Sequence, residues 1–288
     1  MSVLVLGAGG QVGRALLERG GSAVIGFDRA ACDITDARSV ARALATPGVL
    51  VVVNCAGYTA VDRAERERDL AFSINATGAE MVGRQAAALA LPVIHLSSDY
   101  VYSGMGTGAY CEDEPTAPVN VYGASKAAGD ALLILANPRH LVLRISWVFG
   151  VHGANFVRTM LRLAGEHREI RIVDDQIGGP TEARDIADAI LTMALACRRS
   201  SFAAWGVYHF SGTPTTSWYG FAQAIFERTK GARPRLTPIP SGDYPTPARR
   251  PGNSRLDCTK IGRVFGISQP DWRTALSRIL AVIDGVPV

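Results

Sequence analysis

The sequence predicts an α/β protein, in which a doubly wound parallel sheet is followed by a smaller C-terminal α/β lobe. Short apolar, β-branched runs alternate with helical patterns from residue 3 to residue 145. A glycine-rich turn separates the first apolar run from the first helical pattern, and the alternation becomes less regular after Gly150. Apolar strands separated by helices are typical of βαβ units, whose right-handed crossovers build a parallel sheet that is buried on both faces.

Each element follows from its local pattern. In the first half the apolar runs predict five strands: Val3–Leu6, Ala23–Phe27, Leu50–Asn54, Val93–Leu96 and Leu141–Ile145. The helical patterns between them are Gln11–Arg19, Ala37–Ala45, about Asp69–Ala90 and Val121–Leu135. The second half is expected to contain the helices Asn155–Ala164, Arg184–Cys197, Trp218–Thr229 and Asp271–Ile283 and the strands Ile170–Val173 and Val207–Phe210. We assign 1–150 to the sheet domain, with 184–210 packing back onto it, and 151–183 with 211–288 to the lobe.

The segment from Pro234 to Pro251 holds six of the fifteen prolines. Such a segment cannot form a helix or a central strand, because proline lacks the backbone N–H and has a fixed φ. It is either a flexible linker or an ordered loop that lines a site. The aromatic and basic residues Tyr244, Arg249 and Arg250 favour the loop.

Composition excludes several classes of protein. Hydrophobic residues make up 48% and charged residues 19%, so the chain is not intrinsically disordered. The net charge of +4 is not gathered into a Lys/Arg stripe, and no nucleic-acid partner is expected. No apolar run approaches the ~18 residues of a membrane helix. The N-terminus enters a strand-like run at once, so we expect no signal peptide. The five scattered cysteines form no C-x-x-C pair and the histidines lack metal spacing. We therefore expect a cytoplasmic protein without a metal site.

The glycine-rich turn predicts a dinucleotide site. Gly7, Gly10 and Gly13 have the spacing G-x-x-G-x-x-G, directly after the first strand and at the start of the first helix. Glycines there let the backbone turn sharply and approach a pyrophosphate, whose charge the helix N-terminus attracts. The strand, turn and helix context is that of a Rossmann NAD(P)-binding domain.

The residues after the second strand are expected to bind the adenosine end of that cofactor. Asp28 can accept hydrogen bonds from an adenosine ribose, whereas Arg29 can pair with the 2′-phosphate of NADP. Both residues are present, so the sequence leaves NADH and NADPH open. Asp33 and Ile34 follow in the same loop, where they can meet the edge and the face of the adenine.

Tyr122 and Lys126 form a candidate catalytic pair. They are four residues apart on a predicted helix and therefore project from one face. The ammonium of Lys126 is expected to lower the pKa of Tyr122 from about 10 and to make the phenol an acid that works near neutral pH. Ser98 follows the fourth strand, where open α/β sheets bind ligands, and its hydroxyl can hydrogen-bond a substrate carbonyl oxygen. Ser98, Tyr122 and Lys126 together predict a proton-transfer group beside a nicotinamide.

With these residues the chain resembles the extended short-chain dehydrogenase/reductases and, more narrowly, the dTDP-4-dehydrorhamnose reductase family. The resemblance runs nearly from end to end. The Tyr-x-x-x-Lys pair is shared across the superfamily, whereas the stretch Tyr58–Asp62 and the Arg-Pro-x-Asn-Ser stretch Arg250–Ser254 are much more specific. The other matching stretches are Gly10–Gly13, Asn54–Glu65, Ser97–Tyr102, Pro118–Lys126, Arg144–Gly150, Gly153–Val157, Asp175–Thr181 and Tyr244–Ser254.

The resemblance implies NAD(P)H-dependent reduction of the C4 keto group of dTDP-4-dehydro-6-deoxy-L-mannose, with Tyr122 as the acid, Ser98 orienting the substrate and Lys126 on the nicotinamide ribose. The cofactor would contact Gly7, Gly10, Gln11, Val12, Gly13, Asp28, Arg29, Asp33, Ile34, Ala56, Gly57, Tyr58, Ser97, Tyr122 and Lys126. The sugar would face Thr59, Val61, Ser98, Asp99, Tyr100, Val101 and Trp147. The nucleotide would lie near Asn155, Gln176, Arg250, Asn253 and Ser254, where the Arg250 guanidinium suits a diphosphate.

The chain departs from the family pattern in a few places. Ser98 stands where the family has threonine and keeps the hydroxyl, Tyr102 replaces phenylalanine, and Gly57 replaces alanine. Arg184 occupies a position where some members place a glutamate that holds a magnesium ion between subunits, so we expect a monomer or a homodimer that no metal bridges. Two other functions remain open: reduction or epimerisation of another nucleotide-sugar, and a non-catalytic NADP-binding regulatory subunit.

Overall fold

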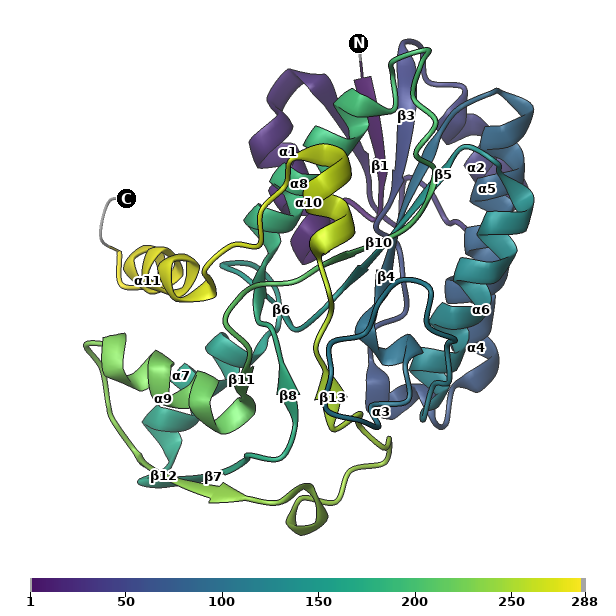
Figure 1. Ribbon diagram of the computed structural model, residues 1–288. Coiled ribbons are helices and arrows are strands. Elements are labelled where there is room, and N and C mark those ends of the chain that lie inside the picture. Colours follow the sequence, from purple (N-terminus) through teal and green to yellow (C-terminus); the bar gives the residue numbers. More distant parts are fainter. Residues whose placement is uncertain (1, 286–288) are drawn as a thin grey trace.

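A six-stranded parallel sheet organises the computed structural model, which describes residues 2–285 (Figure 1). Its strands are β1 (Ser2–Leu6), β2 (Val24–Phe27), β3 (Val49–Asn54), β4 (Val93–Ser98), β5 (His140–Ile145) and β10 (Gly206–Phe210). They lie in the order β10-β5-β4-β3-β1-β2, and all neighbouring strands are parallel. The predicted parallel sheet is confirmed.

Helices cover both faces of this sheet, so its strands are apolar without alternation. Val51 and Val53 of β3 belong to one core, whereas Val52 between them belongs to the other, because successive side chains point to opposite faces. The first core includes α1 (Gln11–Gly20), α8 (Ala183–Ala196) and α10 (Thr259–Phe265). The second includes α2 (Ala37–Leu44), α5 (Ala79–Ala88) and α6 (Val121–Ala136), on the other side of the sheet in Figure 1.

The long helix expected at about Asp69–Ala90 is interrupted. It consists of α4 (Arg68–Phe72), a π-helical segment Ser73–Gly78 and α5. The π segment carries Asn75, whose buried side chain accepts a hydrogen bond from the Tyr58 N–H at 2.8 Å and donates to Ser125 Oγ at 2.9 Å. Wider π turns of this kind occur frequently at functional sites. Here the turn ties α4 and α5 to α6 and to the chain that leaves β3.

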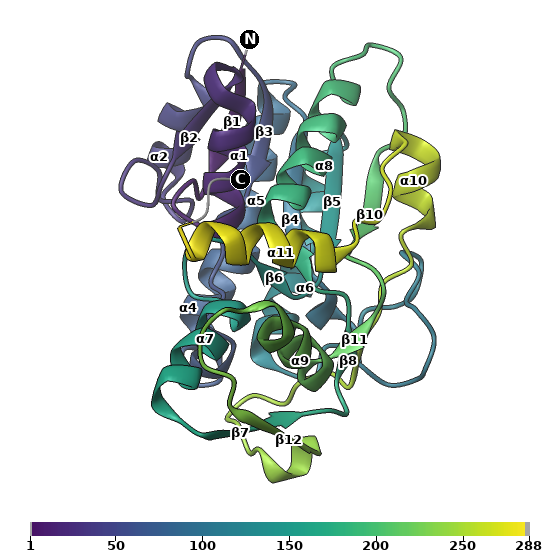
Figure 2. The ribbon, with the colours of Figure 1, turned by 90° about the vertical axis from the view of Figure 1, so that its left-hand side faces the viewer.

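A second unit lies beyond the carboxyl ends of the strands. It contains α7 (Phe156–Glu166), α9 (Trp218–Arg228) and α11 (Trp272–Ile283), with the parallel pair β7 (Glu169–Val173) and β12 (Arg235–Ile239). The three helices begin at side-chain caps, since Asn155, Ser217 and Asp271 each accept a backbone N–H of the first turn. In Figure 2 α11 runs between α9 of this lobe and the sheet domain.

The proline-rich segment is ordered. It forms β12, a 3₁₀ turn at Ser241–Asp243 and a loop that returns to the sheet domain. Among the strands of residues 2–285, β12 pairs with β7 alone, so Pro238 occupies an edge strand, where its missing N–H breaks no inner ladder. The linker interpretation is wrong for this segment.

The remaining elements are short and were not predicted, because two to seven residues carry too little periodicity. They are α3 (Val61–Ala64), β6 (Val148–Phe149), β8 (Ile177–Gly178), β9 (Thr181–Glu182), β11 (Thr216–Ser217), β13 (Asn253–Ser254), α10 and the 3₁₀ turns Gly21–Ala23 and Asp99–Val101. β10 and α8 pack with the sheet. α10 falls in the range expected for the lobe, yet its Ile261 lies in a core of the sheet domain. Within residues 2–285 no helix is both long and apolar enough to span a membrane.

The contact of α6 with the π segment predicts the effect of one glycine substitution. A Cβ at Gly129 would lie 2.0 Å from the Asn75 carbonyl oxygen, which is backbone and cannot rotate away. Gly129→Ala should lower the free energy of unfolding by about 1–3 kcal/mol in urea titrations, through overpacking. Gly165→Ala in α7 is the control, since its Cβ meets no heavy atom within 4 Å. An equal effect of the two substitutions would contradict the packing account.

Candidate active site

The chain reverses the order of its strands between β1 and β3, and a ligand of an open α/β sheet binds at such a point. The turn after β1 passes close to the end of β3. Gly7 has a φ of +81°, and a Cβ there would lie 2.5 Å from the Ala56 backbone nitrogen. A Cβ at Gly13 would lie 2.4 Å from the Gly7 carbonyl oxygen. These two glycines are therefore required by the turn itself.

Gly10 is different, because a Cβ there would meet only the Gly7 carbonyl oxygen, at 3.4 Å. It is the N-cap of α1 and provides no side-chain cap, so the first N–H groups of that ten-residue helix are left for another acceptor. The turn lines two cavities that are described below. Its geometry fits the dinucleotide pyrophosphate that the glycine spacing predicts.

The first cavity, of about 510 Å³, extends from this turn to the loop after β2. Asp28 and Arg29 lie at its rim and are exposed, whereas Ile34 is buried. Asp33 Oδ1 accepts from the N–H and the hydroxyl of Thr35, at 2.9 and 2.7 Å, and these bonds lower the pKa of Asp33. The predicted cofactor residues in this wall are Gly7, Gly10, Asp28, Arg29, Asp33, Ile34, Ala56, Gly57 and Tyr58.

The second cavity, of about 620 Å³, shares Gly10, Ala56 and Gly57 with the first and brings Ser98, Tyr122 and Lys126 together. The predicted residues in its wall are Gly10, Gln11, Val12, Gly13, Ala56, Gly57, Thr59, Val61, Ser97, Ser98, Asp99, Tyr100, Tyr122, Lys126 and Trp147. The three candidate catalytic residues come from β4 and α6, whose ends meet at this edge of the sheet.

The expected lowering of the Tyr122 pKa is wrong. Burial raises the pKa of Tyr122 to about 12, although a hydrogen bond with Ser98 opposes this rise. Burial likewise lowers the pKa of Lys126 to about 8. The Lys126 ammonium donates to the Leu96 carbonyl oxygen at 2.5 Å and lies 3.4 Å from His95 Nε2, on the β4 side of α6. Loss of water contact therefore outweighs the effect of the Lys126 charge on Tyr122.

The start of α6 is fixed from three directions. A Cβ at Gly123 would lie 2.1 Å from the Tyr100 carbonyl oxygen, so only glycine lets the helix approach the turn after β4. Asn120 caps the helix, with its Oδ1 2.7 Å from the Gly123 N–H. Glu65, which follows α3, accepts from the Val121 N–H at 2.8 Å. The helical turn that carries Tyr122 is thereby held against the turn after β4.

Ser98 is hydrogen-bonded to its neighbour. Its hydroxyl donates to Asp99 Oδ1 at 3.0 Å and accepts from the Tyr100 N–H at 3.2 Å. Asp99 is buried, and the burial raises its pKa to about 6. Asp99 therefore positions the Ser98 hydroxyl, and Tyr100 packs edge-to-face on Tyr122 with ring centroids 5.7 Å apart.

Two tryptophans form the wall between the second cavity and the lobe. Trp147 has a φ of +46°, which is uncommon outside glycine and places its ring on Trp218, with ring centroids 3.6 Å apart. A Cβ at Gly178 would lie 2.5 Å from the Trp147 ring. Gln176 accepts from Trp218 Nε1 at 3.1 Å and donates to Ser241 Oγ at 2.9 Å. Backbone strain of this kind is found at ligand sites.

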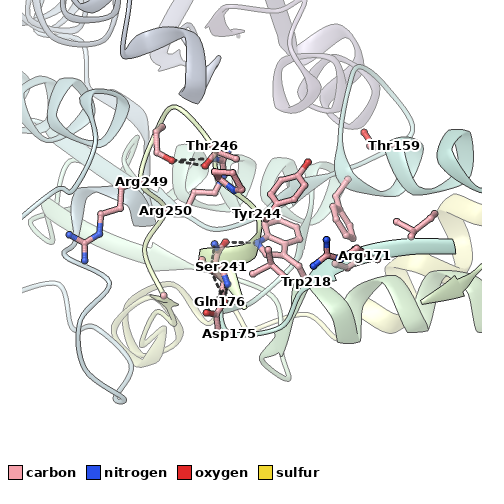
Figure 3. A pocket seen from close by; sticks show the side chains of 18 of the residues that line it. Thr159, Arg171, Asp175, Gln176, Trp218, Ser241, Tyr244, Thr246, Arg249 and Arg250 are labelled. Atoms are coloured by element: carbon pink, nitrogen blue, oxygen red, sulfur yellow. Dashed lines mark hydrogen bonds between the residues drawn. The ribbon is translucent and has the colours of Figure 1, made fainter. Parts of the chain in front are cut away.

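The third cavity, of about 810 Å³, adjoins the second across Phe156 and Trp218 and lies between β7, α7 and the proline-rich loop (Figure 3). Gln176 and Arg250 line it, as predicted for the nucleotide end. Arg250 is already paired, because its NH1 and NH2 donate to the two oxygens of Asp62 at 3.0 and 2.8 Å. The pair fixes the returning loop to α3 and lowers the pKa of Asp62.

Four predicted substrate residues lie outside these three cavities. Val101 is fully buried in a core of the sheet domain, and Ser254 is buried in β13. Asn155 caps α7 and donates to the Gly150 carbonyl oxygen at 2.8 Å. Asn253 donates to the Gly108 carbonyl oxygen at 2.7 Å and accepts from the Arg255 N–H. The structure gives these side chains a role in supporting the walls of the cavities.

Sequence reasoning missed several residues of the site. Trp218, Phe156 and Asp62 were not singled out because their partners are distant in the sequence. The Asp62–Arg250 pair, for example, joins positions 188 residues apart. Asn75 lay within a pattern read as ordinary helix. The stretch that contains Asp62 and Glu65 was noted only as part of the resemblance, and its two carboxylates could have signalled contacts of this kind.

The family model for the RmlD substrate binding domain matches residues 1–284. A dTDP-4-dehydrorhamnose reductase of Aggregatibacter actinomycetemcomitans is 41% identical over 98% of this chain and 99% of its own length. The chain belongs to the dTDP-4-dehydrorhamnose reductase family. A crystal structure of such a reductase from Bacillus anthracis, in complex with NADP, has a TM-score of 0.90 and 34% identity, covering 98% of this chain and 100% of that one. One from Clostridium acetobutylicum gives 0.92 and 31%, with 99% and 100% covered.

The membership confirms the family and the enzyme class that the sequence indicated. Within residues 2–285 no cluster of three or more His, Cys, Asp or Glu side chains is arranged for a metal ion.

The tryptophan stack supplies a test of this site. Gly178→Ala places a methyl group in the Trp147 ring and should separate Trp147 from Trp218. We expect the circular dichroism couplet of two stacked indoles to weaken or vanish. Gly242→Ala is the control, because Gly242 lines the same third cavity and its Cβ meets nothing within 4 Å. A full couplet in Gly178→Ala, at wild-type stability, would show that the close packing is not what holds the stack.

Proposed function

We propose that this protein reduces the C4 keto group of dTDP-4-dehydro-6-deoxy-L-mannose with NADPH or NADH, giving dTDP-L-rhamnose. The observation that carries the proposal is the meeting of Ser98, Tyr122 and Lys126 in a cavity that opens on one side to the glycine turn and on the other to the third cavity. Family membership supports the same activity.

The three cavities divide the ligands between them. A nicotinamide dinucleotide would lie along the first and second cavities, with its pyrophosphate at the glycine turn and its adenosine at Asp28 and Arg29. When bound, it supplies the hydride. The keto-sugar would then lie in the second cavity, beside Thr59, Val61 and Trp147. The nucleotide would extend past Trp218 into the third cavity, with its diphosphate near Arg250.

Tyr122 is the proposed acid. The raised pKa of this buried phenol keeps the proton on its hydroxyl oxygen throughout the neutral range, as protonation of a developing alkoxide requires. Ser98, held by Asp99, orients the carbonyl oxygen toward Tyr122. Lys126 holds the nicotinamide ribose and places a positive charge beneath the site. Ser98 and Lys126 are buried in the wall of the second cavity and Tyr122 is half-buried beside them.

The alternatives are less well supported. A regulatory NADP-binding subunit has no need for an intact Tyr122–Lys126 pair in a shared cavity. Turnover of another nucleotide-sugar remains the second candidate. Purified protein mixed with NADPH and the dTDP-keto-sugar should consume the nicotinamide absorbance, whereas turnover only with a GDP- or UDP-sugar would reject the specific assignment.

Removing the Tyr122 hydroxyl tests the acid role. Tyr122→Phe should lower kcat by about 10²–10⁴-fold while leaving the Kd of NADPH nearly unchanged, because a general acid acts only on the developing alkoxide. Steady-state kinetics and fluorescence titration of the cofactor measure the two effects. Tyr219→Phe, which removes a hydroxyl from α9 outside the three cavities, is the control. Wild-type turnover in Tyr122→Phe would assign the proton to another group.

The Asp62–Arg250 pair tests the place of the nucleotide. Asp62→Asn removes the charge that anchors the returning loop, so we expect the KM of the nucleotide-sugar to rise about three- to tenfold, or ~1 kcal/mol. The Kd of NADPH should not change, since neither residue lines the first cavity. Asp188→Asn, which breaks an exposed pair with Arg19 far from the loop, is the matched control. A change in the Kd of NADPH with no change in KM would place the nucleotide elsewhere.

A further inference from the structure

Lys126 lies in surroundings that disfavour its charge. The side chain is 4% exposed, and the ammonium donates to the Leu96 carbonyl oxygen at 2.5 Å. Burial of an ammonium without a counter-charge costs several kcal/mol, and the group then loses its proton instead. The proposed work of Lys126, to hold a ribose and present a positive charge, requires that the proton stay.

Neutral groups face Lys126 from three elements. Cys55 after β3 is a thiol whose pKa burial raises to about 12. Tyr122, one turn earlier on α6, is a phenol with a pKa raised to about 12. His95 on β4 is fully buried, and its pKa lies well below the usual value because burial and the Lys126 charge both oppose its protonation. None of these groups carries a charge at neutral pH.

Hydrogen bonds fix the orientation of the His95 ring, which lies between Lys126 and the carboxylate of Asp130. Asn54 Oδ1 accepts from the Ala56 N–H at 3.1 Å, which directs the Asn54 amide nitrogen to His95 Nδ1 at 3.2 Å. The neutral ring therefore carries its proton on Nε2. That nitrogen lies 3.4 Å from Lys126 Nζ and 3.9 Å from Asp130 Oδ1. The imidazole thus lies between the ammonium and the carboxylate.

Asp130 is the carboxylate that these groups share. It lies one turn beyond Lys126 on α6 and is 2% exposed. Its Oδ2 accepts from Arg144 Nε at 3.1 Å, whereas its Oδ1 has no hydrogen-bond partner within residues 2–285. Arg144 opposes the rise in pKa that burial causes in Asp130, and so favours the ionised carboxylate. No direct ion pair joins Lys126 to Asp130 in the described chain, and the attraction acts across His95.

Arg144 is itself held in place. Its NH1 donates to the Tyr102 hydroxyl at 2.7 Å, and that oxygen lies 2.7 Å from His209 Nε2. Both Tyr102 and His209 are completely buried. The carboxylate of Asp130 therefore cannot move away from Lys126 without disturbing a polar network that extends from α6 through β5 to β10.

We propose that Asp130 is a positioning residue for the reduction, whose carboxylate, fixed by Arg144 and facing Lys126 across His95, keeps the buried Lys126 ammonium charged. The proposal rests on the proposed function, which gives that charge its purpose. The charge of Lys126 is measurable without turnover. Failure of the proposal about Asp130 is therefore distinguishable from failure of the proposed function.

The sequence makes the measurement direct, since Lys126, Lys230 and Lys260 are the three lysines of the chain. Protein labelled with ¹³C and ¹⁵N lysine gives three side-chain signals in a pH titration by NMR, and Lys126→Arg assigns the first. In the wild type we expect the Lys126 midpoint at about 8. In Asp130→Asn the midpoint should fall measurably, because the charge of Asp130 raises the pKa of Lys126.

Glu182→Gln is the matched control. It also removes a buried carboxylate that is paired with an arginine, Arg278, but on the α8 side of the molecule. We expect lower stability with an unchanged Lys126 midpoint. Asp130→Glu, which keeps the charge, should restore most of the wild-type midpoint. Should Asp130→Asn fail to fold with Arg144 left unpaired, Asp130→Asn with Arg144→Gln removes both charges. The midpoint should still fall there, since Asp130 is the charge that acts on Lys126, but by less, because the repulsion from Arg144 is lost as well.

Turnover gives a second readout. The alkaline limb of the pH profile of kcat should move to lower pH in Asp130→Asn, in step with the Lys126 midpoint. An unchanged Lys126 midpoint in Asp130→Asn, or in the double variant with Arg144→Gln where the single one does not fold, would overturn the proposal, as would an equal fall in Glu182→Gln.

Discussion

The close approach of α6 to β4 and to the π segment sets the position of the reactive groups. Gly123 lies between Tyr122 and Lys126 and Gly129 follows them on α6, and a Cβ at either glycine would collide with a backbone carbonyl oxygen, at 2.1 or 2.0 Å. A larger side chain at either position would push the helix outward. Lys126 would then lose its reach to the Leu96 carbonyl oxygen, and Tyr122 its contact with Tyr100.

The same approach determines the electrostatics of the site. It removes Tyr122 and Lys126 from water, which raises the pKa of the phenol and lowers that of the ammonium. Only a neutral phenol has the proton that the developing alkoxide takes up, so burial favours the form of Tyr122 that acts as an acid. It works against Lys126, which needs its proton. The Asp130–Arg144 pair behind His95 opposes the loss of the Lys126 proton that burial favours. On α6, Tyr122 one turn before Lys126 thus acts as the acid, and Asp130 one turn after it keeps Lys126 charged.

The sequence was sufficient for features that depend on neighbouring residues. The glycine turn, the strands of the sheet and the Tyr122–Lys126 spacing are all local patterns, and the structure places them as expected. Burial is not local, because it depends on how α6 packs, and the predicted direction of the Tyr122 pKa was wrong for that reason. Asn253 and Asn155 likewise have distant partners that the sequence does not show: Asn253 donates to the Gly108 carbonyl oxygen, and Asn155 donates to Gln11 Oε1.

Long-range pairs account for the rest of what the sequence could not show. Arg250 is predicted to meet a diphosphate, and in the structure its guanidinium also pairs with Asp62 and fixes the proline-rich loop to α3. Tyr102, read as a departure from the family pattern, places its hydroxyl between Arg144 and His209. The roles of such residues cannot be predicted from the sequence, because they depend on partners that only the fold brings close.

The transfer of hydrogen itself tests the central claim most directly. The protein would be incubated with the dTDP-keto-sugar and NADPH that carries deuterium on the transferable position of the nicotinamide, and the product examined by mass spectrometry and NMR. The account predicts one deuterium per product molecule, on C4 of the sugar, with one NADPH oxidised for each. Conversion of the sugar without deuterium at C4, or tight binding of NADPH with no conversion of the keto-sugar, would contradict it.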